Sequence, residues 1–147
     1  MKGKRAFGVA AAVFLADRGT KLFWDRIPAE GMTLIPGVIG LYPARNTGMA
    51  FSLGSGIPWL AGVLSLVIIG AAFFLLRGKD LPPLAETGLM MMLGGAAGNL
   101  TDRFLLGYVP DMIELLFVRF AVFNVADACL VAGCGLGIVS LLREKGK

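Results

Sequence analysis

Two aspartates in the C-terminal part of the chain stand in otherwise apolar sequence and could form a catalytic pair. Asp111 lies in the stretch YVPDMI (108–113), and Asp127 lies in FNVAD (123–127), within a run from 120 to 142 that has no Lys or Arg. Two carboxyl groups held close together cannot both ionise easily, so one keeps its proton. The ionised group can then activate water, while the protonated group hydrogen-bonds a scissile carbonyl, as in aspartic proteases. Spacing alone leaves a second interpretation open, in which both are ordinary carboxylates at a membrane interface.

Other charged residues also interrupt apolar stretches, where a charge is costly unless it has a partner or a function. Asp17 and Lys21 are spaced i, i+4, so they share a helix face and can neutralise each other, either as a structural pair or as part of a site. Asp102 and Arg103 can likewise form ion pairs between helices or contribute to a site. All four lie at the same outer depth as the two aspartates above, whereas Glu86 lies at the cytoplasmic end, where we expect it to be solvated.

Histidine is absent, which excludes a Ser-His-Asp triad, a Cys-His pair and a histidine-ligated metal. We therefore expect neither a metal nor a cofactor. Cys129 and Cys134 are five residues apart in one apolar run, so on a helix they point in different directions, and no disulfide is expected. No basic stripe interleaved with aromatic residues is present, so nucleic acid is not an expected partner.

The elements that carry these residues are predicted to be membrane helices. Hydrophobic residues make up 56% of the 147 residues and charged residues only 16%, below the roughly 25% of soluble domains. Four stretches have the length of about 20 mainly apolar residues that a membrane helix needs: 6–24, 57–76, 84–106 and 121–142. Because charges interrupt the first stretch and no clear cleavage site follows it, we expect a retained helix rather than a signal peptide. The prediction is a single membrane-embedded, all-α domain, a bundle of four transmembrane helices.

The distribution of Lys and Arg predicts the orientation, because positive residues collect in cytoplasmic loops. On one side lie Lys2, Lys4, Arg5, Arg77, Lys79, Arg143, Lys145 and Lys147. On the other side lie Arg26, Arg45 and Arg119. Both termini are therefore predicted to be cytoplasmic, and segments 25–56 and 107–120 are predicted to face outward.

The outward segment 25–56 is too long for a simple turn. It is rich in Gly and Pro, and the short runs Met32–Ile35 and Val38–Tyr42 lie between these residues. This alternation of Gly and Pro with short apolar runs is typical of short strands joined by turns. We expect a small extracytoplasmic β-sheet between the first two helices, lying on the membrane surface.

Five local elements, in this order along the chain, resemble those of lipoprotein signal peptidases (signal peptidase II). They are DRGTK (17–21), NTGMAFS (46–52), GGAAGNLTDR (94–103), GYVPDMI (107–113) and FNVAD (123–127). No single element is diagnostic, but the ordered set across a chain with four expected spans is highly specific. The resemblance implies an aspartyl membrane protease without metal, which cleaves bacterial prolipoproteins just before a diacylglyceryl-modified cysteine.

The resemblance also implies roles for individual residues. Asp111 and Asp127 are implied to be the catalytic pair, and Asp102 is not one of the two. Residues implied to line or support the site are Asn46, Asn99, Arg103, Asn124, Asp17, Lys21, Gly95 and Ala126. The small residues from Gly94 to Gly98 are expected to let the third helix approach the fourth closely. Met49 and Pro110 depart from the usual residues of the family, which puts the substrate preference in question.

The resemblance places the protein in the cytoplasmic (inner) membrane of a bacterium, with its site near the outer face. The expected partners are a lipid-modified prolipoprotein and membrane lipid, and the expected state is a monomer. The alternative is a small non-catalytic membrane protein, a transporter subunit or a scaffold. A transport path needs polar groups at several depths, whereas the second stretch, 57–76, carries no charge.

Overall fold

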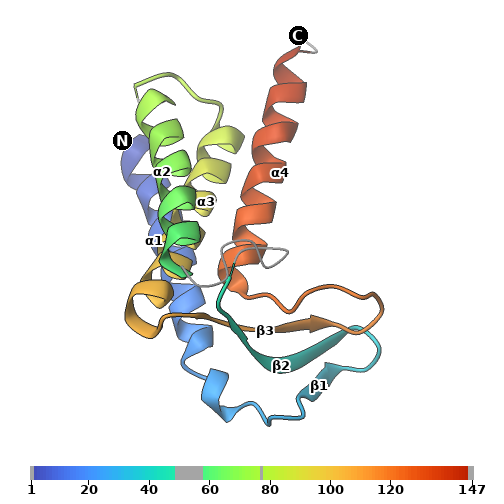
Figure 1. The fold of residues 1–147 in the computed structure, drawn as a ribbon. Helices are drawn as coiled ribbons and strands as arrows, with labels where there is room; N and C mark the ends of the chain where they lie inside the picture. Colours follow the sequence, from blue (N-terminus) through green and yellow to red (C-terminus); the bar gives the residue numbers. More distant parts are fainter. Residues whose placement is uncertain (1, 49–57, 77, 146–147) are drawn as a thin grey trace.

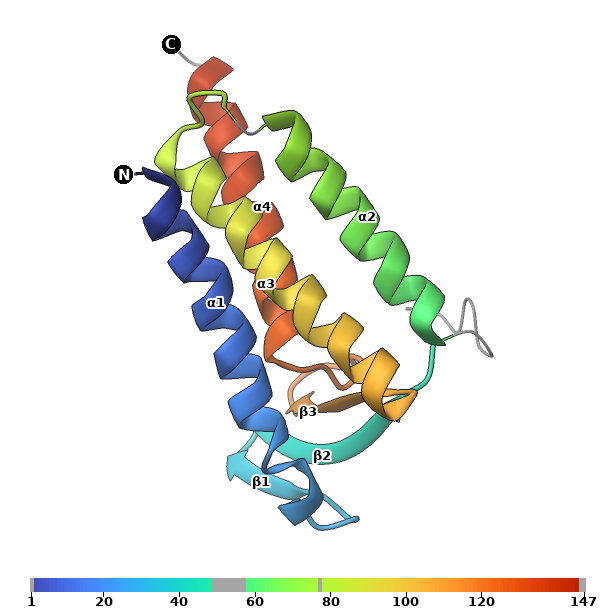
Figure 2. The ribbon, with the colours of Figure 1, turned by 90° about the vertical axis from the view of Figure 1, so that its left-hand side faces the viewer.

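A computed structural model describes residues 2–48, 58–76 and 78–145 of the chain. Four helices run alongside one another, and a small sheet lies across one end of them (Figures 1 and 2). The helices are α1 (Lys2–Lys21), α2 (Pro58–Leu76), α3 (Pro83–Leu106) and α4 (Val125–Lys145), and a short 3-10 helix, η1 (Trp24–Arg26), follows α1. Each predicted apolar stretch therefore overlaps one helix.

The sheet is antiparallel and has the strand order β1 (Met32–Ile35), β2 (Ile39–Asn46) and β3 (Val109–Leu115). The first two strands form the predicted hairpin, but the third comes from the segment 107–120. The expectation of a sheet between the first two helices is therefore wrong for its third strand, and Asp111 lies in this strand of the outward segment 107–120. A two-stranded hairpin is marginally stable, so β3 supplies the strand that it lacks. Pro110 is tolerated because β3 lies at the sheet edge.

Two helix starts are set by local chemistry. α3 begins with Pro83, whose fixed backbone angle suits a first helical turn, and Glu86 in that turn is half-buried. α4 begins at Val125 and not at 121 as predicted, because Phe123 still pairs with Ile113 of β3 in a β-bridge. Both cysteines of α4 are free, as expected.

α3 lies at the centre of the bundle and packs against α1, α2 and α4. A Cβ atom added at Gly94 would lie 2.5 Å from a backbone oxygen of α1, and one added at Gly95 would lie 2.6 Å from the backbone oxygen of Ala126 in α4. At Gly98 it would lie 2.6 Å from the Asp17 carboxylate. The small residues therefore bring α3 close to α4, as predicted. They also bring α3 close to α1, which the prediction did not include.

The helices differ in how clearly they suit a membrane. Among the described residues, α4 is the one helix whose length and composition suffice to cross a bilayer, with mean hydropathy 2.1 over Val125–Glu144. α2 contributes a shorter apolar stretch, Gly62–Leu76. Large apolar side chains are nevertheless exposed on all four helices, including Leu15, Val67, Ile68, Leu105 and Val131. Such a surface is typical of contact with lipid and not with water.

Candidate active site

Buried polar side chains collect at the sheet end of the helices and form one connected network of hydrogen bonds. Its members are Asp17, Lys21, Asn99, Asp102, Asp111 and Asn124. Polar groups are rarely buried without partners, and here segments far apart in sequence supply them. The polar layer predicted from the sequence is therefore present.

Asp127 is positioned by the first turn of α4. The side-chain oxygen of Asn124 accepts the backbone N–H of Asp127 at 2.9 Å, and the Asp127 carboxylate accepts the backbone N–H of Asn124 at 3.4 Å. This reciprocal arrangement is a capping box, in which the residue before the helix and the third residue within it satisfy each other's backbone. The FNVAD element thus encodes a helix start that fixes one of the two aspartates.

Asp111 is held by two amide side chains. Asn46 of β2 donates to one carboxylate oxygen at 3.0 Å, and Asn124 donates to the other at 2.6 Å. Asn124 therefore contacts both members of the predicted pair, one through its NH₂ group and the other through its oxygen and its backbone. The Asp111 side chain is almost fully buried, whereas Asp127 is half-buried.

Asn99 of α3 completes the bridge between the aspartates. Its NH₂ group donates to Asp127 at 2.7 Å, and its oxygen accepts from Asn124 at 3.2 Å and from Lys21 at 3.1 Å. With two donors on its oxygen, the Asn99 amide has one favourable orientation, and its NH₂ group must face the carboxylate.

Asp17 and Asp102 form an ion cluster that Lys21 joins to Asn99. Lys21 donates to Asp17 at 2.8 Å and to Asp102 at 2.6 Å, and Arg18 pairs with the second oxygen of Asp102. Asp17 also accepts the backbone N–H of Ala126 at 3.0 Å. The predicted Asp17–Lys21 pair is present, and Asp102 makes ion pairs between helices, with α1.

Arg103 lies at the polar end of a cleft of about 870 Å³ between α2, α3 and α4. Two of its nitrogens donate to the backbone oxygens of Asn99 and Gly48, at 3.3 and 3.2 Å. Its Nε is buried, and among the described residues it has no hydrogen-bond partner. Asn46, Asn99 and Asp127 also line the cleft, and apolar lining residues include Ala96, Phe123, Leu130 and Val131.

Electrostatics couples the two aspartates. The pKa of Asp111 is raised to about 6, first by burial and then by the negative charge of Asp127. Hydrogen bonds from Asn46 and Asn124 and the positive charge of Lys21 act in the opposite direction. Because Coulomb interactions weaken with distance, the effect of Asp127 means that the two carboxyl groups lie near each other. Asp111 can therefore carry a proton at a pH near neutrality.

The sequence did not reveal every residue that contacts this network. Arg18 pairs with Asp102, and the indole of Trp24 donates to the backbone oxygen of Asp111 at 2.9 Å. The position of Arg18 inside an apolar stretch was a usable signal, since a charge there needs a partner. Trp24 gave no signal, because an aromatic residue at the end of an apolar helix is ordinary. The NTGMAFS element is described only as far as Gly48, so Met49 lies outside the described residues.

Comparison with known proteins identifies the family. The sequence profile of the family described as Signal peptidase (SPase) II matches residues 9–143. The chain belongs to this family. A lipoprotein signal peptidase from Trichormus variabilis is 41% identical over 145 residues, covering 94% of this chain and 87% of its own. One from Streptococcus pyogenes serotype M5 is 35% identical over 146 residues, covering 97% and 96%.

Solved structures agree with this membership of the signal peptidase II family. A structure described as a bacterial membrane enzyme, determined by the in meso method at 2.3 Å, superposes with a TM-score of 0.85 at 27% identity, covering 97% of this chain and 90% of the other. A second such structure, at 1.9 Å, gives a TM-score of 0.81 at 28% identity, covering 95% and 93%. The predictions of a membrane protein, a protease and signal peptidase II function are confirmed.

Proposed function

We propose that this signal peptidase II removes the signal peptide from diacylglyceryl-modified prolipoproteins, cutting before the lipidated cysteine, with Asp111 and Asp127 as its catalytic pair. The observation that carries the proposal is the shared contact with Asn124, which hydrogen-bonds both carboxylates. The resemblance in sequence singles out the same two aspartates. The names of the relatives, lipoprotein signal peptidases, support this choice of substrate.

The two aspartates differ in a way that suits them to different roles. Asp127 lies in the first turn of α4, where the helix dipole favours negative charge, and it lines the cleft. Asp111 is almost fully buried, and its pKa is raised to about 6. We assign Asp127 as the base that activates water and Asp111 as the acid that protonates the substrate carbonyl.

The proposed reaction has two steps. In the first, Asp127 takes a proton from water, the water oxygen bonds to the carbonyl carbon, and Asp111 gives its proton to the carbonyl oxygen. In the second, the C–N bond breaks, the leaving nitrogen takes the proton from Asp127, and one hydroxyl returns a proton to Asp111. The products are a carboxyl group on the signal peptide and a free amino group on the lipidated cysteine.

The cleft offers a place for the substrate. Its apolar lining between α2 and α4 suits an acyl chain or an apolar peptide that stays within the bilayer. The buried Nε of Arg103, which has no partner within the described part of the chain, is a donor available to a substrate carbonyl beside Asp127. A cleft of this kind, with polar groups at one end, keeps the lipid in the membrane while the peptide bond meets water.

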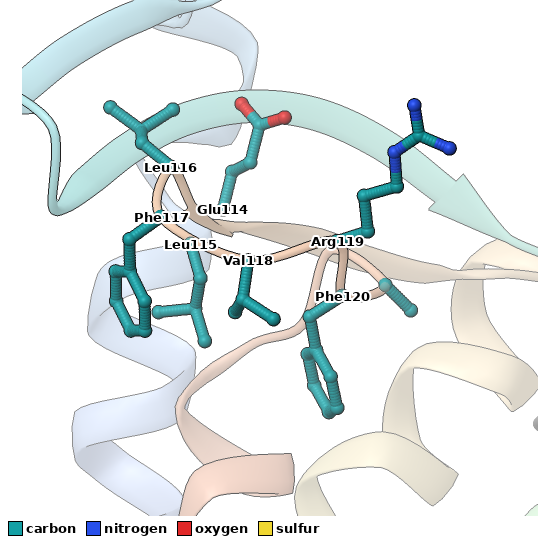
Figure 3. A pocket seen from close by; sticks show the side chains of 8 residues that line it. Glu114, Leu115, Leu116, Phe117, Val118, Arg119 and Phe120 are labelled. Atoms are coloured by element: carbon teal, nitrogen blue, oxygen red, sulfur yellow. The ribbon is translucent and has the colours of Figure 1, made fainter.

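For the topology, we propose that all four helices span the bacterial inner membrane, with both termini cytoplasmic and the site near the outer face. The start of α1 and the end of α4 lie at the end of the bundle opposite the sheet (Figure 1). The end of β3 and the loop after it bound a shallow hollow, around which most apolar side chains project to the side on which the helices lie, whereas Leu116 and the charged side chains project to the opposite side (Figure 3). The apolar ones on the helix side are Leu115, Phe117, Val118 and Phe120, and the charged ones are Glu114 and Arg119. This division supports a sheet that rests on the outer membrane surface.

We further propose that the chain acts as a monomer, because one chain supplies every residue of the network. The transporter or scaffold alternative is disfavoured by the position of that network at one end of the bundle. α2 contributes no charged residue over Pro58–Leu76, so a polar path through the bilayer would lack one wall.

The decisive experiment compares Asp111→Asn and Asp127→Asn with the unaltered enzyme. Each protein is purified in detergent and incubated with a lipid-modified prolipoprotein, and the release of the signal peptide is followed by a gel shift. We expect cleavage by the unaltered enzyme and none by either variant. Asp25→Asn, which removes an exposed carboxylate of η1, is the matched control and should cleave normally. Normal activity in either pair variant would end the assignment of the pair.

A further inference from the structure

The position of Asp111 is fixed through its backbone as well as through its carboxyl group. The Trp24 indole N–H donates to the backbone oxygen of Asp111 at 2.9 Å, and both residues are buried. Trp24 lies in η1, just beyond the end of α1, so this bond joins that helix directly to β3. Trp24 belongs to none of the five sequence elements that carry the family resemblance.

The strand ladder around Asp111 offers few donors of its own. Pro43 and Pro110 have no backbone N–H. The register between β2 and β3 also shifts between Leu41 and Ala44, and Ala44 is the residue that pairs with Asp111. Irregular pairing of this kind bends a strand and weakens the ladder locally. A buried donor from outside the ladder therefore has a large influence on the position of this part of β3.

The indole is itself held in a fixed orientation. The guanidinium carbon of Arg45 lies 5.5 Å from the centre of the Trp24 ring and 5.0 Å from that of Tyr108. The two rings are 6.1 Å apart and tilted by 47°. Cation–π attraction of Arg45 to both rings restricts the movement of the indole. Arg45 comes from β2 and Tyr108 directly precedes β3, so the same strands that carry the site also hold the indole.

We propose that Trp24 is a positioning residue for the reaction: its N–H, held in place by Arg45 and Tyr108, fixes the backbone of Asp111. The carboxyl group then stays between Asn46 and Asn124. This inference rests on the proposed role of Asp111. Trp24 is not one of the described residues that line the cleft. Loss of its N–H therefore slows the chemical step without weakening substrate binding.

The test removes the N–H and keeps the ring. Trp24→Phe should lower kcat by about three- to tenfold, the value of one hydrogen bond, with KM unchanged within error. Benzothienylalanine placed at position 24, which replaces the N–H by sulfur in a ring of the same shape, should reproduce this loss. Phe23→Leu is the matched control, since Phe23 is exposed beside Trp24, and it should leave kcat unchanged.

Arg45→Met provides the second variant if Trp24→Phe does not fold, because it frees the indole and leaves the N–H in place. It should lower kcat by less than Trp24→Phe does. An unchanged kcat in the benzothienylalanine protein, or a rise in KM alone, overturns the inference. The inference is also overturned if activity falls only in those variants whose melting temperature is lower, and in proportion to that decrease. If Asp111→Asn is active, the proposed function fails; if Asp111→Asn is inactive and the position 24 variants are normal, only this inference fails.

Discussion

Four buried or half-buried aspartates lie at the sheet end of the helices, and they form two pairs with different surroundings. In the first pair, Asp17 and Asp102 are neutralised by Lys21 and Arg18. The two negative and two positive charges cancel, and the two ion pairs of Asp102 join α3 to α1. A cluster of this kind ties helices together, because removal of one member leaves a buried charge without its partner.

In the second pair, Asp111 and Asp127 accept hydrogen bonds from uncharged groups. The donors among the described residues are the side chains of Asn46, Asn99 and Asn124 and the backbone of Asn124. Amide groups orient a carboxylate without cancelling its charge. Burial and the charge of Asp127 raise the pKa of Asp111 to about 6, which suits the role proposed for this pair.

The contrast shows how one residue type serves two purposes within one polar layer. In the first pair, cations neutralise the carboxylates and join two helices, whereas in the second pair amide groups orient the carboxylates without neutralising them. Substitutions in the first pair should therefore affect mainly stability, and substitutions in the second pair should affect mainly catalysis.

The largest expected effect is on catalysis by the second pair. Asp111→Asn and Asp127→Asn should each lower the rate of cleavage at least about 10³-fold, because neither an acid nor a base can be replaced by an amide. Neither variant should unfold at a lower temperature than the unaltered enzyme, since each removes one of two like charges. Single-turnover cleavage and thermal unfolding in detergent measure the two effects. A variant with a lower melting temperature and residual activity would mean that this pair, like the first, stabilises the fold and does not catalyse the reaction.

The first pair should show the reverse result. Asp17→Asn and Asp102→Asn should lower the free energy of unfolding by about 3–5 kcal/mol, the cost of breaking a buried ion pair. Protein that remains folded should keep measurable activity. Chemical unfolding and the specific activity of the folded fraction provide the measurements. A stable but inactive Asp102→Asn variant would mean that the cluster takes part in the reaction.

Asn124 connects the helix cap with the second pair, and two substitutions can separate these roles. Asn124→Ala should lower the free energy of unfolding by about 0.5–2 kcal/mol through loss of the cap. Asn124→Ser restores a capping oxygen but lacks the longer amide NH₂ group that donates to Asp111, so stability should recover while kcat stays low. Full activity in Asn124→Ser would show that the bond to Asp111 is dispensable.

The smallest effect is a shift in pH dependence. The pKa of Asp111 is raised to about 6, so its protonated form, and with it kcat/KM, should decline as pH rises through that value. The associated stability is present below the ordinary pKa of an aspartate and is lost as pH rises through about 6. Asn46→Ala removes a bond to the charged form and should move the decline to higher pH. If the pH profile of kcat/KM is the same in Asn46→Ala as in the unaltered enzyme, Asp111 is not the group whose titration causes the decline.

Much of the helical framework could be predicted from the sequence, and the resemblance to signal peptidase II singled out the candidate pair. Runs of apolar residues predict helices because a helix satisfies its own backbone within one segment. β1 was predicted with the bounds that it has, since turn residues flank it. The Asp17–Lys21 pair was also accessible, because residues four apart on a helix are neighbours whatever the rest of the chain does.

Contacts between distant segments could be decided only by the tertiary structure. β3 was missed because a strand in a short outward segment becomes visible only when β2 pairs with it. The partners of Asp102 lie on α1, and the donor to the backbone of Asp111 is Trp24, 87 residues away along the chain. Local patterns report neighbours a few residues apart, whereas these bonds depend on how α3 packs against α1 and on where the sheet closes. The sequence alone placed these aspartates in apolar surroundings, where each needs a partner, and the packing decided which of them pair with cations and which accept hydrogen bonds from Asn side chains.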